Sequence, residues 1–481
     1  MKLAVTIRTL GVLFMLFSTT LILPLAVSLV YRDGQAAHFS ITFALAAAIG
    51  LAFWLPVRRR HSTIRTRDGF AIVALMWTAM SVLGAVPFML ALDLSFADAL
   101  FESASGYTTT GATVLSGLDE MPRSILLYRQ ELQWLGGIGV VVLSVALLPM
   151  LGIGGMQLYR AEVPGPFKDE RVTPRIARTA RRLSELYVAF TAACALCYWL
   201  AGMEPFDAIA HGMATVATGG YSTHDASIAY FDSPLIELVA IVFMLIGSIN
   251  FSVHFLAWRT LHFKLYGRDT QTRVFLSLVA ILTAFTALVL YAAGTYERPT
   301  EALRYAAFQV VSSMSTTGFS TANFSLWPLA LPVLMIFASF IGGCAGSTSG
   351  GLKVIRFVVL AKQAGVHLKR LIHPRSQNPV RVDGRIVPDS IIDGIWGFFT
   401  VYIAVFAVLM LVLMLDGVDQ VTAFGAVATT LNNLGPGLGE VAVTFASMSE
   451  PATLLMAFSM ILGRLEIFTF LVLLTPAFWR R

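Results

Sequence analysis

The stretch Ser315-Thr316-Thr317-Gly318-Phe319-Ser320 ends a semi-apolar segment, residues 302–319, that is shorter than the roughly 20 residues a membrane span needs. The stretch carries no Asp, Glu, Lys or Arg, so its polar atoms are hydroxyls and backbone carbonyls. Non-helical backbone at membrane depth is tolerated only where it is buried in protein or lines a water-filled path. The sequence therefore predicts a re-entrant element here.

Three further segments share this design, because each starts near an acidic residue and ends in a small, glycine-bearing run. The segments are 96–114, 206–221 and 421–438, and their runs are Thr108-Thr109-Thr110-Gly111-Ala112-Thr113, Ala217-Thr218-Gly219-Gly220-Tyr221-Ser222 and Asn432-Asn433-Leu434-Gly435-Pro436-Gly437. An acid suits a helix N-terminus, where it caps free N–H groups or meets the positive end of the helix dipole. The sequence predicts four short helices, which begin near Asp98, Asp207, Glu301 and Asp419.

The four runs mark an internal repeat. Gly111, Gly219, Gly318 and Gly435 lie roughly 100 residues apart, and such periodicity decides an architecture before any single motif does. Each repeat contains a span, a short helix, a glycine run and a second span. The expected boundaries are 1–67 for two extra N-terminal helices, then 68–181, 182–273, 274–389 (with an interrupted second helix) and 390–481 for the repeats.

The composition is that of a membrane protein. Hydrophobic residues make up 57% of the 481 residues and charged residues only 13%, about half the charged share of a soluble globular protein. Water-soluble enzymes, disordered chains and coiled coils are excluded on these numbers. We expect an all-α integral membrane protein with its four repeats around a pseudo-fourfold pore and ten spans: 10–31, 39–57, 70–92, 132–151, 186–202, 238–258, 274–293, 326–343, 394–415 and 452–478.

The positive charges orient these spans. With both termini in the cytoplasm, 28 of the 34 Lys and Arg residues fall on the cytoplasmic side, as the positive-inside rule requires. The acidic residues show the reverse bias, which gives the outer face a net negative charge that attracts cations.

The glycine runs point to a cation path. Four carbonyl-rich segments around one axis can replace the hydration shell of a cation, and a calcium pore would be expected to carry acidic rings instead. The short helices would aim their negative C-terminal ends at the ion. The simpler interpretation, that the runs are ordinary turns on the outer face, does not account for their fourfold recurrence. We therefore expect a monovalent cation.

Several motifs resemble a known family. Thr109-Thr110-Gly111, Ala217-Thr218-Gly219, Thr316-Thr317-Gly318 and Asn433-Leu434-Gly435 resemble the four filter segments of the Trk/Ktr/HKT superfamily of potassium transporters. Residues 342–353 and Gly463-Arg464-Leu465-Glu466 are similar to its bacterial members, and the two extra helices fit the TrkH-type subgroup. The fourth run departs most from the pattern.

The resemblance implies potassium uptake across the bacterial inner membrane through a gated, channel-like pore, with single-glycine filters. It implies that the backbone carbonyls of the twelve filter residues just quoted bind potassium, and no organic cofactor is expected. It also implies a homodimer and a cytoplasmic, nucleotide-binding regulatory partner of the TrkA type. Membrane lipid is a further expected partner, and nucleic acid is not.

Residues 326–343 form an apolar span that dissolves into small residues, and each Gly there costs a helix about 1 kcal/mol relative to Ala. Interrupted segments of this kind line cavities or binding sites. The resemblance makes this stretch a gate below the filter, with Arg464 as an electrostatic barrier; a plain cytoplasmic turn is the alternative, and a phosphate-binding P-loop fails because Leu352 follows Gly351. The expected gate residues are Gly342, Gly343, Gly346, Ser347, Thr348, Ser349, Gly350, Gly351, Lys353 and Arg464.

A mid-membrane arginine costs at least about 2.5–3.5 kcal/mol, so Arg464 needs a partner. Glu466 is two residues away and does not share its helix face, which points instead to the carbonyls of the interrupted loop. A buried ion pair without a transport role is the other interpretation of this residue.

Two other classes of function make different demands on the sequence. A sodium- or proton-coupled secondary transporter would need an intramembrane carboxylate, and only Glu466 lies well inside a predicted span. A membrane-embedded enzyme is not expected, because no nucleophile–base pair or metal motif is evident. His211 and His224 are expected to pack or to lie at the surface. The basic stretches 160–182 and 353–385 are expected on the cytoplasmic side, either as a docking face for the regulatory partner or as plain positive-inside topology.

Overall fold

Two hydrophobic helical segments precede the repeats. In the computed structural model, which describes residues 3–59, 66–146 and 174–480, α1 (Leu3–Thr20) continues into α2 (Ile22–Tyr31), and α3 (Ala36–Trp54) packs against α1 before the turn η1 (Leu55–Val57). Small residues allow this close approach, since a Cβ at Gly11 would lie 2.8 Å from the carbonyl oxygen of Gly50. The expected extra helices are therefore present.

Each repeat then has a first helix, a short pore helix and a second helix. The first helices are α4 (Thr66–Gly84) with α5 (Val86–Leu92), α10 (Pro174–Leu200), α15 (Thr270–Ala292) and α19 (Asp389–Leu415). The pore helices are α6 (Phe96–Tyr107), α11 (Pro205–Val216), α16 (Pro299–Met314) and α20 (Gln420–Asn432). The second helices are α7 (Arg123–Ala146), α12 (Pro234–Ser248), α17 (Leu331–Ile341) and α21 (Glu450–Arg464).

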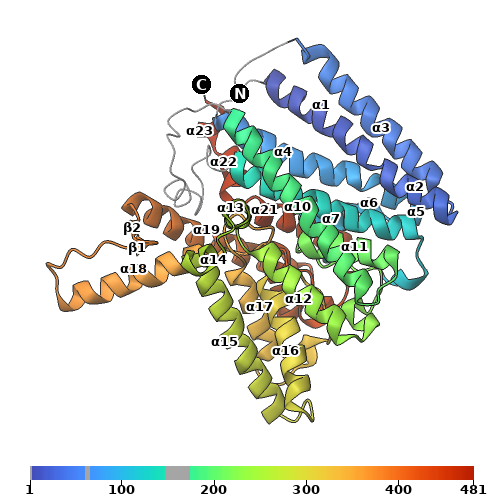
Figure 1. The fold of residues 1–481 in the computed structure, drawn as a ribbon. Helices are drawn as coiled ribbons and strands as arrows, with labels where there is room; N and C mark the ends of the chain where they lie inside the picture. Colours follow the sequence, from blue (N-terminus) through green and yellow to red (C-terminus); the bar gives the residue numbers. More distant parts are fainter. Residues whose placement is uncertain (1–2, 60–65, 147–173, 481) are drawn as a thin grey trace.

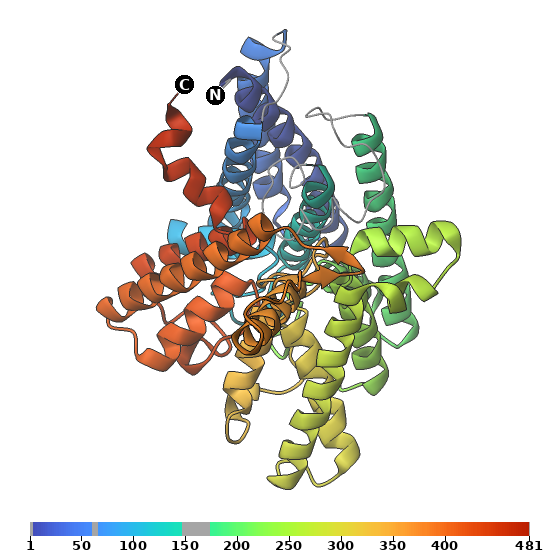
Figure 2. The same ribbon diagram turned by 90° about the vertical axis from the view of Figure 1, so that its left-hand side faces the viewer.

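The repeats close into a ring. Each pore helix packs against the second helix of the preceding repeat: α11 on α7, α16 on α12, α20 on α17, and α6 on α21, which joins the fourth repeat back to the first. Figure 2 shows the four groups around one centre, from blue and teal through green and yellow to orange and red. A 3-10 turn follows the glycine run in every repeat: η2 (Leu118–Glu120), η3 (Ser227–Phe231), η4 (Phe324–Leu326) and η5 (Gly439–Val441).

Two expected spans are wrong as continuous helices. Residues 238–258 break after Ser248, and α13 (Phe251–Thr260) leaves α12 at 97°, before the short α14 (Lys264–Arg268). Asn250 caps the new helix, because its Oδ1 accepts a hydrogen bond from the Ser252 N–H. Residues 452–478 break after Arg464, and α22 (Phe468–Leu474) leaves α21 at 109°, with α23 (Pro476–Trp479) at its end. Arg464 thus ends a helix instead of lying inside one.

The second helix of the third repeat is the shortest of the four. Only Leu331–Ile341 of the expected span 326–343 is helical, and the chain resumes as α18 (Val354–Ile372) after a loop. α18 projects away from the ring beside the two-stranded antiparallel hairpin of β1 (Arg381–Val382) and β2 (Arg385–Ile386) (Figure 1). The short helix and the loop bring small residues under the centre of the ring.

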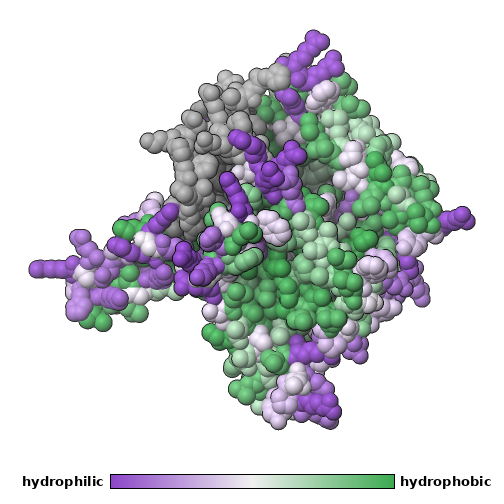
Figure 3. All heavy atoms as spheres, in the orientation of Figure 1, coloured by the Kyte–Doolittle hydropathy of each residue, from purple (hydrophilic) through white to green (hydrophobic). Residues whose placement is uncertain are grey.

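The surface is that of a multi-pass membrane protein. Within the described residues, six helices are long and apolar enough to span a membrane, or up to eight if each bent pair counts as one span. Figure 3 shows a broad hydrophobic area over the helices, with hydrophilic residues on the projecting α18 and at the connection between α15 and α16. Leu200, Leu288 and Leu415 are 71%, 65% and 87% exposed, which suits contact with lipid. Of the expected span 132–151, residues 147–151 lie outside the described part, as do residues 160–173 of the first basic stretch.

Candidate ion pathway

The four pore helices end in the same hydrogen-bond pattern. In each, one N–H bonds to the carbonyl three residues back, and the next N–H bonds to the carbonyl five residues back. This is the Schellman ending, in which the first of the two residues takes the left-handed conformation and is usually Gly. Here those residues are Thr109, Thr218, Thr316 and Asn433, at φ 53°, 51°, 54° and 57°. Positive φ is rare for a β-branched residue, so its recurrence in three repeats makes the segment a candidate functional site.

This pattern corrects the register of the second run. A glycine of positive φ stands two residues after each left-handed residue: Gly111, Gly220, Gly318 and Gly435, at φ 84°, 80°, 86° and 101°. The counterpart of Gly111 is therefore Gly220. The expectation that 217–219 match 109–111 is wrong by one residue, since the matching triplet is Thr218-Gly219-Gly220. The double glycine made either register possible from the sequence.

The four glycines meet in a closed ring. A Cβ added at Gly111 would collide with the carbonyl oxygen of Gly219, and one at Gly220 with that of Thr317. A Cβ at Gly318 would likewise collide with the Leu434 carbonyl oxygen, and one at Gly435 would lie 2.9 Å from the Thr110 carbonyl oxygen. Backbone carbonyls of one run thus touch the glycine of the next run around the whole ring, and no side chain fits between them.

A cavity of about 410 Å³ opens on the face of the ring opposite to the loop between α17 and α18, and this face is named the outer side. All four runs contribute to its lining, among them with Gly111, Gly220, Gly318 and Pro436. No residue of these four triplets is charged. An ion that enters from the outer side therefore meets backbone and hydroxyl groups at the ring.

The loop between α17 and α18 lies against the other side of the ring. The Gly350 N–H donates to Thr316 Oγ1 over 2.6 Å, and the Gly351 N–H donates to the Asn432 carbonyl over 3.0 Å. Thr348 Oγ1 lies 3.1 Å from the Val216 carbonyl and 3.2 Å from Thr218 Oγ1. The loop thus contacts three of the four runs, and the alternative of a plain cytoplasmic turn is wrong.

Two basic side chains, those of Arg464 and Lys353, lie under this loop. Arg464 is 8% exposed, and its Nη1 donates to the Thr348 carbonyl over 2.9 Å; the expectation that loop carbonyls are its partner is confirmed. Lys353, at φ 75°, donates from Nζ to the Ser349 carbonyl. Both line a small inner cavity of about 50 Å³, which has space for only a few water molecules. Glu466 pairs with Arg356 of α18 over 2.5 Å.

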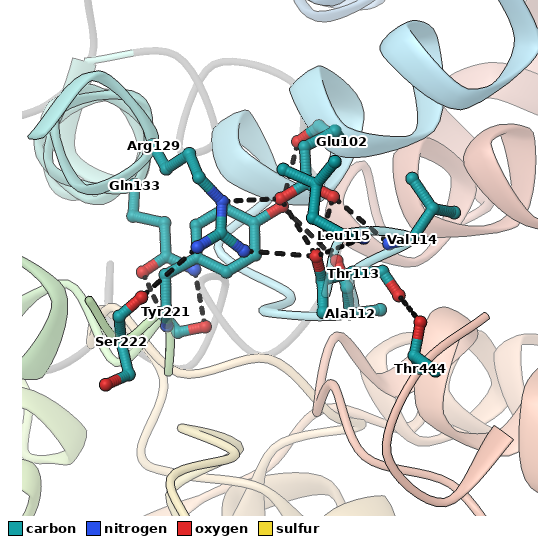
Figure 4. A network of polar contacts seen from close by, with 11 residues as sticks. Glu102, Ala112, Thr113, Val114, Leu115, Arg129, Gln133, Tyr221, Ser222 and Thr444 are labelled. Carbon is teal, nitrogen blue, oxygen red and sulfur yellow. Dashed lines mark hydrogen bonds and ion pairs between the residues drawn. The ribbon is translucent and has the colours of Figure 1, made fainter. Parts of the chain in front are cut away.

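A buried polar network behind the first two runs was not anticipated from the sequence (Figure 4). Arg129 of α7 pairs with Glu102 of α6 over 2.7 Å, and both side chains are at most 1% exposed. Arg129 also donates to the Ser222 carbonyl over 3.2 Å, and its guanidinium lies 4.1 Å from the centre of the Tyr221 ring. Glu102 accepts from Thr113 Oγ1 and from the Val114 N–H. A buried pair of this kind could have been sought in the sequence, because Glu102 interrupts an otherwise uncharged part of the first short segment.

The histidines take structural positions. His211 is fully buried in α11, with Nε2 2.9 Å from Ser222 Oγ. His224 bridges Asp119 and Asp207 and stacks on Tyr230 at 3.5 Å between ring centres. His254 contacts the Ile246 carbonyl across the α12–α13 break. In the described parts of the chain, no three His, Cys, Asp or Glu side chains are grouped to hold a metal ion.

Comparisons with known proteins agree on one family. A family model described as "TrkH: Cation transport protein" matches residues 35–481. The Trk system potassium uptake protein TrkH of Vibrio parahaemolyticus is 52% identical over 478 residues, which cover 98% of this chain and 99% of that protein. The TrkH protein of Escherichia coli K12 is 50% identical over 475 residues, 98% of each chain.

The fold comparison gives the same result. The crystal structure of the potassium transporter TrkH from Vibrio parahaemolyticus superposes with a TM-score of 0.93 at 49% identity, and it covers 100% of both chains. Sequence and structure therefore match over the whole length that carries the ring, the loop and the outer cavity. The chain belongs to the TrkH family of cation transport proteins.

Proposed function

We propose that this chain takes up potassium ions across the bacterial inner membrane through a gated, channel-like pore. The observation that carries the proposal is the closed ring of four glycine-bearing runs, which offers backbone carbonyls to an ion and has no charged residue of its own. Rings of carbonyls select potassium by replacing its hydration shell. The names of the relatives, all potassium uptake proteins of the Trk system, support the same ion.

The ions bind at the carbonyls of 109–111, 218–220, 316–318 and 433–435. In the second run this moves the predicted site by one residue, so that Ala217 gives way to Gly220. The pore helices stabilise the ion further, because the negative ends of their dipoles point at the ring. One glycine of positive φ per triplet gives a shorter filter than that of potassium channels.

The loop 342–351 is the gate, and Arg464 sets the barrier below it. The loop is pinned to three of the runs by hydrogen bonds, and the cavity beneath it is small. Opening requires the loop to leave Thr316, Asn432 and Thr218, which breaks these bonds. The net positive charge of Lys353 and Arg464 opposes a cation at this level while the loop is in place.

The pore works as part of an assembly. We place both termini in the cytoplasm, where α18 and its hairpin project with Lys369, Arg370 and Arg375. This basic projection is the docking face for a nucleotide-binding regulatory protein of the TrkA type, and the protein forms a homodimer in the lipid bilayer. A sodium- or proton-coupled transporter is the alternative mechanism.

The test is uptake of rubidium-86 into proteoliposomes of the purified protein, with excess sodium or potassium as competitor. We expect passive uptake that potassium blocks and sodium blocks weakly. Gly318→Ala should abolish it, because the added Cβ meets the Leu434 carbonyl. Gly267→Ala is the matched control, because no atom lies within 4 Å of a Cβ there.

Other results would count against the proposal. Uptake that appears only with a sodium or proton gradient would show a coupled transporter and contradict the passive pore. If Gly318→Ala kept full selective uptake, the ring would not lie on the ion pathway.

A further inference from the structure

The second run lacks the side chains that hold two of the others in place. In the first run, Thr108 Oγ1 and Thr110 Oγ1 form a hydrogen bond of 2.7 Å, and in the third run Ser315 Oγ and Thr317 Oγ1 form one of 2.6 Å. The two members of each pair flank the left-handed residue, and the hydrogen bond between their side chains holds its backbone in place. The corresponding residues of the second run are Ala217 and Gly219, which cannot form such a pair.

Gln133 of α7 fills the empty place. A Cβ at Gly219 would lie 2.8 Å from Gln133 Nε2, so the amide occupies the space in which a side chain of residue 219 would begin. Gln133 Nε2 donates to the Gly219 carbonyl over 2.6 Å, and its Oε1 accepts from the Tyr221 N–H over 3.1 Å. Both polar ends of one fully buried side chain thus hold the backbone on either side of Gly220 (Figure 4).

The bond makes the second run different from the other three. Thr110, Thr317 and Leu434 correspond to Gly219, and among the described residues the hydrogen bonds found include none to the carbonyls of these three. The Gly219 carbonyl lies against Gly111, at the contact between the first and second runs. A shift of this carbonyl would change the spacing of the ring at one of its four contacts.

Gln133 is itself held in place by its own helix. Arg129 is one turn earlier on the same face of α7 and binds the Ser222 carbonyl, while its partner Glu102 lies on the first pore helix. The two α7 side chains therefore bind the second run at residues 219, 221 and 222. Arg129 and Gln133 belong to the first repeat, so their hydrogen bonds to the second run also join two neighbouring repeats.

We infer that Gln133 is a positioning residue for ion selectivity, which supplies from a neighbouring helix the support that the second filter run lacks. This inference rests on the proposed potassium pore. Without the amide, the double glycine is free to move and the ring accepts ions of other sizes. Of the two hydrogen bonds of Gln133, the one to the Gly219 carbonyl acts at a contact of the ring. Its loss corresponds to a roughly threefold to tenfold change, which we expect in the ratio of potassium to sodium competition.

The experiment compares Gln133→Met with Gln130→Met by rubidium-86 uptake into proteoliposomes, with sodium and potassium titrated as competitors. Gln130 is also a fully buried glutamine of α7, and its amide has no hydrogen-bond partner among the described residues. We expect Gln133→Met to be blocked by sodium at a threefold to tenfold lower concentration than the wild type. Gln130→Met should keep the wild-type ratio.

A second variant covers the case in which Gln133→Met does not fold. Gln133→Glu has the same shape and keeps an acceptor for the Tyr221 N–H, but its carboxylate cannot donate to the Gly219 carbonyl, so the selectivity should fall in this variant as well. Wild-type selectivity in the folded Gln133 variants, or an equal loss in Gln130→Met, would overturn the inference. A wild-type protein without potassium-blocked uptake would instead refute the proposed pore itself.

Discussion

Arg464 is a charged residue in an apolar stretch of sequence. Only the fold shows which groups surround its side chain. Arg464 ends α21, is almost fully buried, and has one hydrogen bond, to the Thr348 carbonyl of the loop. Within the described residues, its Nε and Nη2 have no hydrogen-bond partner. A buried and incompletely bonded guanidinium is costly, which is consistent with the barrier role proposed for its charge.

Replacing Arg464 should therefore change the resting flux. Arg464→Ala removes the positive charge and the bond to the loop, and we expect basal rubidium uptake to rise about tenfold or more, as for the loss of a charged hydrogen bond. Arg464→Lys keeps the charge and should stay near the wild-type rate. Uptake in proteoliposomes checks both, and a basal flux that is unchanged or lower in well-folded Arg464→Ala contradicts the barrier role.

Between elements, one ion pair lies at the break between α21 and α22. Glu466 and Ile467, at φ 55° and 45°, form the turn between α21 and α22. Glu466 pairs there with Arg356, which also donates to the Leu352 carbonyl and lies over the ring of Phe398 at 4.0 Å. The pair ties the start of α18, directly after the loop, to the turn of the fourth repeat.

Breaking this pair should destabilise the protein. Arg356 is 1% exposed and Glu466 19%, and loss of one partner of a buried pair costs about 3–5 kcal/mol. We expect Glu466→Gln to lower the free energy of unfolding by about 3 kcal/mol, the smaller end, because Glu466 still meets solvent. The measurement is thermal unfolding in detergent. The double variant Arg356→Met/Glu466→Gln should recover part of the lost stability. Equal stability of the wild type and Glu466→Gln would show that the pair contributes little.

A second link between elements joins the outer loops of the first two repeats. His224 lies between Asp119 of η2 and Asp207 of α11, beside a cavity that is also lined by Arg123 and Glu204. Partial burial alone would lower the pKa of His224, but the hydrogen bonds and charges of Asp207 and Asp119 outweigh it and raise the pKa above 6.5. The charged imidazole then bonds to one carboxylate on each side.

The sign of the pH effect follows from the raised pKa. The stabilisation is complete below pH 6.5, the ordinary value, and is lost as the pH rises through the higher pKa of the folded protein. We expect the melting temperature of the wild type to exceed that of His224→Gln at low pH, by the equivalent of about 1 kcal/mol or less. The difference should vanish at high pH. Parallel melting curves of the two proteins across the whole pH range would rule out this link.

For the whole molecule, the ring is closed by packing between the first and last repeats. α6 lies against α21, and the Phe445 N–H donates to the Thr113 carbonyl over 2.8 Å, which joins residues far apart in the chain. The two termini lie on the same side of the molecule (Figure 1). In Figure 1 the α15–α16 connection lies at the lower end of the molecule, away from the termini at the top, and α18 projects to the left.

Labelling with a membrane-impermeant maleimide tests this arrangement. Thr295 lies in the exposed α15–α16 connection and Lys369 in the exposed part of α18. We expect Thr295→Cys to react in spheroplasts and Lys369→Cys to react only after permeabilisation, in a background without Cys194, Cys197 and Cys344. The opposite pattern would invert the orientation proposed from the positive charges.

The sequence alone determined the class, the fourfold repeat and the place of each pore helix, because these depend on local quantities. Apolar length, charge asymmetry and acids at helix starts are properties of a few consecutive residues; Asp419, for example, caps α20 as expected. The loop 342–351 and the partner of Arg464 were also predictable, since a glycine-rich break and a buried charge each demand an unusual environment.

Only the tertiary structure decided the register of the second run, the helix breaks after Ser248 and Arg464, and the hydrogen bonds of Arg129 and Gln133 to the second run. Gly219 and Gly220 are chemically identical, and their roles differ only through the neighbouring run and α7. At the break after Arg464, the partner of Glu466 is Arg356, 110 residues earlier in the chain. Contacts of this kind depend on which helices lie side by side, and a local pattern of residues carries no information on that.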